Sequence, residues 1–339
     1  MNLITLFEEA VSRKASDIHL ATGEIPCLRI AGDLTRLDGK PLGAAEFQSL
    51  MEAALSAELG ARLRSGISVE RTISHGDHNF SLTAFRASDD GFVATFRILQ
   101  SEVPALDQIG EGGEQLVEKL LQVKRGLVLI TGPTGSGKTT ALCSILEKLN
   151  ETRPARIFMV ERGGPYFSFR SKQGLVTQLH VGQDFETYEH ALEVVHHVDP
   201  DVVATDDIPT AEALRQVMVL AETGHLVLAN LHAESVTDAL RKLFDAASGE
   251  AIALRRSLSQ HLVAISVQRL LHRADRPGRV AAYEWISATP AITNAILHGD
   301  MDRVAHLQGS DPECRTLQTA LADLVARGLI TKESASEVR

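Results

Sequence analysis

A segment that combines glycines, one lysine and two threonines could bind the phosphates of a nucleotide. It reads Gly-Pro-Thr-Gly-Ser-Gly-Lys-Thr-Thr over 132–140, between an apolar run and a helical pattern. Glycines let backbone N–H groups turn inward, and a helix N-terminus adds a positive end, so such a turn cradles phosphates. Lys138 is expected to reach the β- and γ-oxygens and Thr139 to ligate Mg²⁺. The predicted nucleotide-binding residues are Gly132, Pro133, Thr134, Gly135, Ser136, Gly137, Lys138, Thr139 and Thr140.

Carboxylates follow two other apolar runs further along the chain. Glu161 comes after 156–160, and Asp206 and Asp207 come after 202–205. Ligands of parallel sheets bind at the carboxyl ends of the strands, where both positions would fall. Phosphoryl transfer to water needs one carboxylate to support the metal and one to orient or deprotonate the water. These acids are therefore candidates for that chemistry, and solvated loop acids are the alternative.

Two histidines and two arginines form a second group of candidates. His225 and His232 flank an apolar run at 225–229, and a pair so placed could sense the γ-phosphate. Histidines at strand ends are more often surface or core residues. Arg86 and Arg97 lie on predicted strands of the N-terminal region. Alone they would be surface residues, but in an oligomer an arginine can act on a neighbour's phosphate.

The elements that must position these residues alternate between helix and strand. Alternation of this kind predicts an α/β domain over 114–339, with a mostly parallel sheet covered on both faces. A hairpin is expected at 264–286 within a largely helical C-terminal part. The predicted helices are 114–123, 139–150, 187–198 and 210–223, and the predicted strands are 127–130, 156–160, 175–179, 202–205 and 225–229.

The first 99 residues have a different pattern, which predicts a small α+β domain. Apolar spacing indicates helices at 3–14 and 43–64, and alternation indicates strands near 15–20 and on both sides of a turn at Gly32-Asp33. Three further alternating segments lie at 67–74, 79–86 and 91–98. Residues 100–113 mix proline, glycine and acids, which predicts a linker.

Composition excludes several classes of function. The formal net charge of −10, without a long basic block, disfavours a nucleic-acid-binding protein. The three cysteines are isolated in sequence, so neither a zinc site nor a disulfide framework is expected. No run of ~18 apolar residues is present, and the N-terminus carries acids, so we expect a cytoplasmic protein whose membrane association comes through a partner.

The chain resembles the secretion and pilus ATPases of the type II secretion/type IV pilus class, closest to the PilT-like pilus-retraction (twitching motility) branch. The resemblance spans nearly the whole chain. It is carried by an N-domain signature at 15–19, a Walker A motif at 132–140, a Walker B region at 199–203, a His box at 221–232 and segments 279–284 and 324–330.

This resemblance implies a PAS-like N-terminal domain, a RecA-like ATPase domain and a ring hexamer that binds ATP and Mg²⁺. Hydrolysis would drive movement transmitted to an inner-membrane platform protein, placing the ring peripherally at that membrane. His225 and His232 carry over as the His-box pair. Arg97, and less directly Arg86, carry over as residues that act on a neighbour's nucleotide.

Three departures from the family pattern concern charge. The acid-acid-proline of the family's Asp box reads Glu161-Arg162-Gly163 here. Asp207 stands at the place of the catalytic glutamate, one methylene shorter, and Asp206 stands where the family has glycine, as a further metal candidate. Asn79 and Asp90 replace basic residues of the N-terminal domain. Nucleotide binding is therefore expected and fast hydrolysis is not.

Three functions follow as hypotheses. The first is an ATP-hydrolysing hexameric motor, with Asp207 as general base and Glu161 supporting the metal. The second is a slow or inactive nucleotide-binding paralogue that joins or regulates an active ring, which would then be mixed. The third, a small-molecule kinase, leaves the N-terminal domain without a role.

Overall fold

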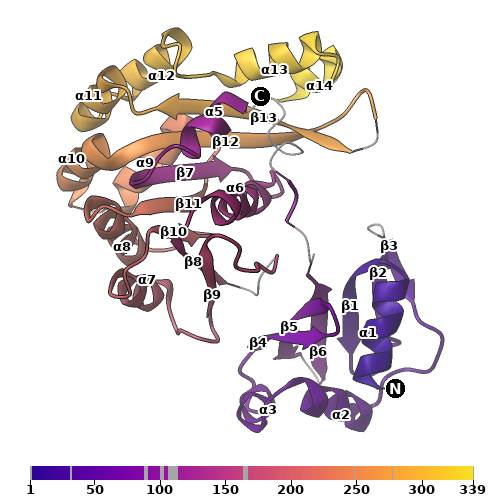
Figure 1. Ribbon diagram of the computed structural model, residues 1–339. Helices are drawn as coiled ribbons and strands as arrows, with labels where there is room; N and C mark the ends of the chain where they lie inside the picture. The colour runs from indigo at the N-terminus through magenta and orange to yellow at the C-terminus, as the bar shows by residue number, and fades with distance from the viewer. Residues whose placement is uncertain are drawn as a thin grey trace. The chain divides into compact units, whose positions relative to one another are not determined.

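The protein is described by a computed structural model (Figure 1) that covers residues 2–30, 33–87, 91–99, 103–105, 114–162, 167–247, 249–276 and 278–338. Contacts among these residues divide the chain into two compact units. The N-terminal unit takes described residues from 1–102, 161–168 and 180–186. The C-terminal unit takes those from 103–160, 169–179 and 187–339. Most of the predicted linker at 100–113 lies outside the described residues.

In its described residues, the N-terminal unit is an antiparallel sheet with three helices. Its six strands are ordered β3-β2-β1-β6-β5-β4, and every neighbouring pair is antiparallel. Phe7 anchors the core, because its ring stacks on Phe80 at 3.8 Å and meets Phe96 edge-on at 5.2 Å. The predicted turn residue Gly32 lies outside the described residues, and Asp33 begins β3. The elements are α1 Leu3–Ser12, β1 Ala15–Ala21, β2 Cys27–Ile30, β3 Asp33–Arg36, α2 Ala44–Ala54, α3 Ala57–Arg64, β4 Val69–His75, β5 His78–Arg86 and β6 Phe92–Ile98.

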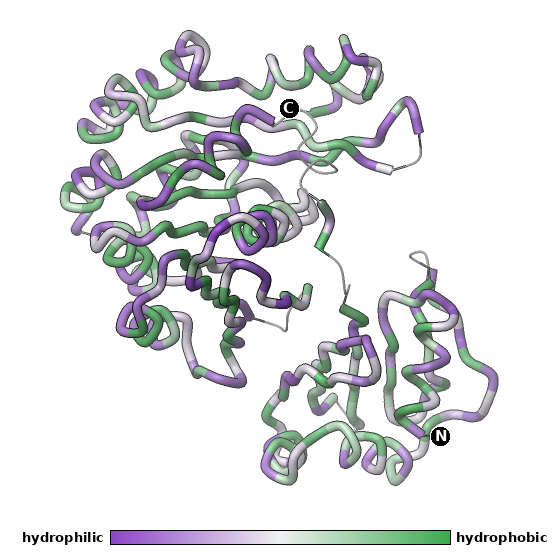
Figure 2. Tube along the Cα trace, viewed as in Figure 1, coloured by the Kyte–Doolittle hydropathy of each residue, from purple (hydrophilic) through white to green (hydrophobic). Residues whose placement is uncertain are grey.

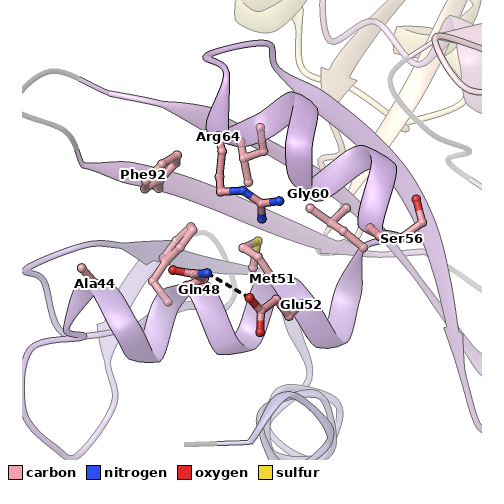
Figure 3. A pocket seen from close by; sticks show the side chains of 12 residues that line it. Ala44, Gln48, Met51, Glu52, Ser56, Gly60, Arg64 and Phe92 are labelled. Carbon is pink, nitrogen blue, oxygen red and sulfur yellow. Dashed lines mark hydrogen bonds between the residues drawn. The ribbon is translucent and has the colours of Figure 1, made fainter.

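The single helix predicted at 43–64 is wrong, because the segment forms the two helices α2 and α3. Leu55 is extended (φ −115°, ψ 152°), and the Ser56 hydroxyl accepts a hydrogen bond from Leu59 N to cap α3. The apolar spacing runs on through this break, so periodicity did not reveal it. A groove of about 410 Å³ lies between the helices, with Arg64 of α3 over it and Glu52 of α2 opposite (Figure 3).

The C-terminal unit confirms the predicted α/β class. Its seven-stranded sheet has the order β13-β12-β7-β11-β10-β8-β9, and the pairs from β12 to β8 are parallel. The predicted hairpin is present, as β12 and β13 pair antiparallel. The elements are α5 Glu114–Leu120, β7 Gly126–Gly132, α6 Lys138–Thr152, β8 Arg156–Arg162, β9 Leu175–Val181, α7 Tyr188–His196, β10 Val202–Thr205, α8 Ala211–Glu222, β11 Leu226–His232, α9 Val236–Ala246, α10 Ala251–His261, β12 Leu262–His272, β13 Arg279–Ser287, α11 Pro290–His298, α12 Met301–Ser310, α13 Leu317–Ala326 and α14 Lys332–Glu337.

The central strands are apolar on both faces because helices cover both. Every residue of β7 and β10 is buried, and Figure 2 shows hydrophobic colouring along β10 and β8. Helix α6 packs on the face that carries Val128 and Ile130, while α8 and α10 also contact β7. Burial on both faces explains why these strands read as continuous apolar runs. No helix among the described residues is both long and apolar enough to span a bilayer.

Candidate functional site

The 132–140 segment joins the end of β7 to the start of α6, as its sequence predicts. Gly132 (φ +148°) and Gly137 (φ +87°) have no room for a side chain. A Cβ on Gly132 would lie 2.4 Å from the carbonyl oxygen of Gln268, and one on Gly137 would lie 2.9 Å from Gln268 Nε2. Strand β12 therefore supports the turn from behind. Thr134 and Gly135 are exposed at its tip, and Thr140 lies in the first turn of α6.

Lys138 begins α6, is only 8% exposed, and folds over the turn. Its ammonium donates to the carbonyl oxygens of Gly132 and Pro133, both at 2.9 Å. Burial lowers the pKa of Lys138, and the carboxylates of Asp207 and Glu234 oppose that shift. These two acids therefore lie within electrostatic reach of the lysine, in a site poor in competing water.

Strand β11 brings further polar residues to the turn. Its register pairs Leu226 with Gly126 and His232 with Gly132, so its carboxyl end lies beside the phosphate-binding turn. Leu226 and Leu228 belong to the core that α6 covers. Alternation then places the next two residues of that face against the start of α6. His232 Nδ1 lies 3.4 Å from Lys138 Nζ, and Asn230 Nδ2 lies 3.5 Å from Thr139 Oγ1.

His225 immediately precedes β11 and lies at the opposite end of that strand from His232. Its carbonyl oxygen accepts from the N–H of Gly126, the first residue of β7. At ~3.3 Å per residue, His225 and His232 are separated by roughly 23 Å along the strand. The His225 ring packs edge-on against His196, with centroids 5.7 Å apart. The structure therefore brings His232, but not His225, to the turn within one chain.

The two aspartates after β10 have different partners. The buried hydroxyl of Tyr188, on α7, donates to Asp206 Oδ1. Asp207 is the aspartate that acts on the pKa of Lys138. Its Oδ1 accepts from Ile208 N, and its carbonyl oxygen accepts from the Thr205 hydroxyl. Successive side chains on an extended segment point in opposite directions, which accounts for the separation.

Glu161, near the end of β8, is 1% exposed and pairs with a histidine. His180 Nε2 lies 3.5 Å from Glu161 Oε1, and His180 Nδ1 lies 3.3 Å from Asp184 Oδ2. Burial alone would lower the pKa of His180, but the two carboxylates outweigh it and raise the pKa above its ordinary value. When His180 is protonated, its positive charge therefore offsets the negative charge of the Glu161 carboxylate.

The candidate arginines belong to the N-terminal unit. Arg97, on β6, has an exposed side chain whose Nε donates to Asp17 Oδ1 at 3.1 Å. Arg86 ends β5, and Asn79, on the same strand, accepts from the Ser74 hydroxyl. Asp90 and Gly163 lie outside the described residues.

Buried polar atoms around the turn fit an anionic, metal-bound ligand. Ser136 Oγ, Asn230 Oδ1 and Gln268 Oε1 are buried without a hydrogen-bond partner in the described part of the chain. An unpartnered buried polar group costs about 1–3 kcal/mol, which phosphate oxygens and a hydrated cation would offset. The turn, its lysine and these atoms together suit a nucleoside triphosphate with Mg²⁺.

Sequence reasoning missed four residues of this region. Asn230 and Gln268 are single amides within apolar strands, and only their strand registers place them at the turn. Glu234 and Tyr188 lie outside any motif. Of these, Glu234 gave the only usable signal, as an acid two residues after His232.

A family model described as "Type II/IV secretion system protein" matches residues 2–333. A "Type IV pilus retractation ATPase PilT" from Pseudomonas aeruginosa is 33% identical, over 99% of this chain and 98% of that protein. A "Twitching motility protein" from Neisseria gonorrhoeae is 30% identical, over 91% of this chain and 83% of the relative.

Among solved structures, a crystal structure of the pilus retraction motor PilT with bound ADP superimposes with a TM-score of 0.90. It is 31% identical and covers 100% of this chain and 97% of its own. The ATPase DotB of Legionella pneumophila, at 21% identity and a TM-score of 0.86, shares the fold.

Proposed function

The chain belongs to the type II/IV secretion system protein family of P-loop ATPases, and on that premise we propose that it is an ATP-driven motor that powers type IV pilus retraction and twitching motility. The observation that carries the proposal is the complete turn at 132–140, with Lys138 buried over it and His232 beside it. The identity of about one third with the P. aeruginosa protein, over nearly all of both chains, supports the specific assignment.

The residues have separate roles in this proposal. Backbone N–H groups of the turn and the Lys138 ammonium bind the phosphates, and His232, 3.4 Å from that ammonium, is proposed to contact the terminal one. Asp207 takes the proton of the attacking water. Mg²⁺, when bound, supplies charge neutralisation on the phosphate oxygens. Thr139 is proposed as its ligand, with Glu161 and Asp206 as supporting acids.

The proposed assembly is a homo-hexameric ring at the cytoplasmic face of the inner membrane, held there by a platform protein of the pilus machine. Arg97 is proposed to act on the nucleotide of a neighbouring subunit, and its exposed side chain supports that role. His225 would act from the amino end of β11, the end opposite to the nucleotide bound by its own chain. Zinc and nucleic acid have no role in this proposal.

Replacing Lys138 by alanine tests the function directly. We expect Lys138→Ala to abolish ATP hydrolysis and to weaken nucleotide binding at least ~10²-fold, because the loss removes a buried charge-assisted contact. Phosphate release and fluorescent-ADP titration measure the two effects, and size measurement with and without ATP measures assembly.

The matched control is Lys148→Ala. Lys148 lies on the same helix, but it is exposed and paired with Glu151. Full activity in the control and an unchanged ATPase rate in Lys138→Ala would reject the P-loop as the catalytic site. A chain that remained monomeric with bound ATP at every concentration would reject the ring.

The second candidate is a slow paralogue that assembles with an active ATPase. It is favoured by the partners of the acids, because Tyr188 holds Asp206 and His180 pairs with Glu161. Asp207 is then the acid left to activate water, and its side chain is one methylene shorter than glutamate. A misplacement of about 1 Å can cost ~10²-fold in rate.

The double variant Asp207→Glu with Arg162→Asp separates the two candidates. For a weakened motor we expect kcat to rise at least ~10-fold, because the longer carboxylate regains reach. Unchanged turnover with normal nucleotide affinity would favour the paralogue. Arg162→Asp alone serves as the control for charge at the end of β8.

A further inference from the structure

Asn230 is a buried amide placed between the phosphate-binding strand and the acidic strand end. It lies on β11, opposite Ile130 of β7, and is 1% exposed. One residue earlier, Ala229 pairs with Thr205 at the end of β10. The amide therefore lies where the two halves of a P-loop site meet, inside the 221–232 His box but with no role assigned to it there.

The Asn230 amide has one long hydrogen bond and one unpartnered oxygen among the described residues. The Nδ2 group lies 3.5 Å from Thr139 Oγ1, at the long limit for a hydrogen bond. The Oδ1 atom is buried and has no partner among the described residues. An amide can turn by 180° with almost no change of shape, which exchanges its donor and its acceptor.

The turned amide changes which of its atoms meets Thr139, and it leaves Nδ2 in the buried position that Oδ1 had. Its Oδ1 would then face Thr139 Oγ1 and accept the hydroxyl proton. A threonine oxygen has one O–H and two lone pairs, so fixing the proton toward Asn230 directs the lone pairs elsewhere. Lys138 cannot substitute for the amide, because an ammonium group only donates.

We propose that Asn230 is a positioning residue for the metal: its amide oxygen accepts the Thr139 proton, so that the Thr139 lone pairs face Mg²⁺. The proposal rests on the proposed function, since it assumes that Mg-nucleotide binds at the turn. Partners that orient a metal ligand in this way typically contribute 10–100-fold to metal affinity. Asn230 thereby links metal binding to β11, the strand that also carries His232.

The test compares nucleotide affinity with and without the cation. Titration of fluorescent ADP is done in EDTA and in saturating Mg²⁺ on the full-length chain. We expect Asn230→Leu to keep the affinity measured in EDTA and to lose at least ~10-fold of the gain that Mg²⁺ gives. Asn230→Asp, which only accepts, should keep that gain or increase it. This pair keeps the test decisive if the leucine variant does not fold.

A double-mutant cycle with Thr139→Ala separates the proposal from a packing effect. Because Asn230 is proposed to act only through the Thr139 hydroxyl, the double variant should lose no more of the Mg²⁺ gain than Thr139→Ala alone. Equal losses in EDTA and in Mg²⁺, or additive losses in the cycle, would overturn the role of Asn230. Failure of the proposed function appears differently, as wild-type chain that binds no nucleotide under either condition.

Discussion

At the residue scale, Lys138 shows how far a motif can predict geometry. The spacing of glycines, lysine and threonine correctly predicts the turn, the start of α6 and the position of the lysine. Few backbone conformations can point several N–H groups at one phosphate. The same spacing contains no information about Asn230, Gln268 or Tyr188. These residues reach the site through strand register and helix packing, which depend on contacts far apart in the chain.

The raised pKa of His180 predicts how the stability of the fold varies with pH. Its pKa is raised in the folded state by Glu161 and Asp184 against the effect of burial. The histidine therefore stabilises the fold fully below its ordinary value of 6.5, and that contribution is lost as pH rises through the folded-state pKa. We expect the loss of stability in His180→Gln to be largest near pH 5.5 and to shrink as pH increases. Urea unfolding across pH measures it.

The exposed His272 supplies the control for this experiment. His272→Gln should change the free energy of unfolding little, because the residue is exposed. A His180 effect that grew with rising pH would contradict the assigned direction of the shift.

At the element scale, the break between α2 and α3 gives a test with opposite signs. The Ser56 hydroxyl caps α3, so Ser56→Ala should lower the free energy of unfolding by about 1 kcal/mol, and Ser56→Gly by only a few tenths. Thermal or urea unfolding measures both. In one continuous helix, alanine would instead stabilise and glycine would destabilise, because alanine has the higher helix propensity.

The same break shows why some elements could not be predicted. Periodicity reports which face is buried, and that face continues through Leu55 while the backbone does not. Strand β11 shows a related limit. The apolar run predicted a strand at 225–229, but pairing with β7 carries the strand through Asn230 and Leu231 to His232. Of these residues, Asn230 and His232 are polar and lie beside the phosphate-binding turn.

At the scale of the whole molecule, the two units have separate hydrophobic cores. Phe80 lies in the core of the N-terminal sheet, and Leu142 of α6 lies in a core of the C-terminal sheet. Units with their own cores can unfold independently. We expect two thermal transitions in calorimetry. Phe80→Ala should lower one by an amount equivalent to ~3–5 kcal/mol, and Leu142→Ala should lower the other.

Nucleotide adds an internal check to that experiment. Saturating ADP should raise the transition that responds to Leu142→Ala, because a ligand stabilises the unit that binds it. A single transition that shifts equally in both variants would show one cooperative unit instead.

The α/β class was predictable because alternating helices and strands leave few topologies. The order of strands on either side of β7 was not, since it depends on which apolar faces meet.

The support of the phosphate-binding turn by β12 has a mechanical consequence. Thr131 at the end of β7 donates to the carbonyl oxygen of Ser266, and Gln268 abuts Gly132 and Gly137 of the turn. The same strand continues through the hairpin into β13, on which helix α13 packs. A displacement of α13 would therefore reach the phosphate-binding turn through β13 and β12, which pair along their length.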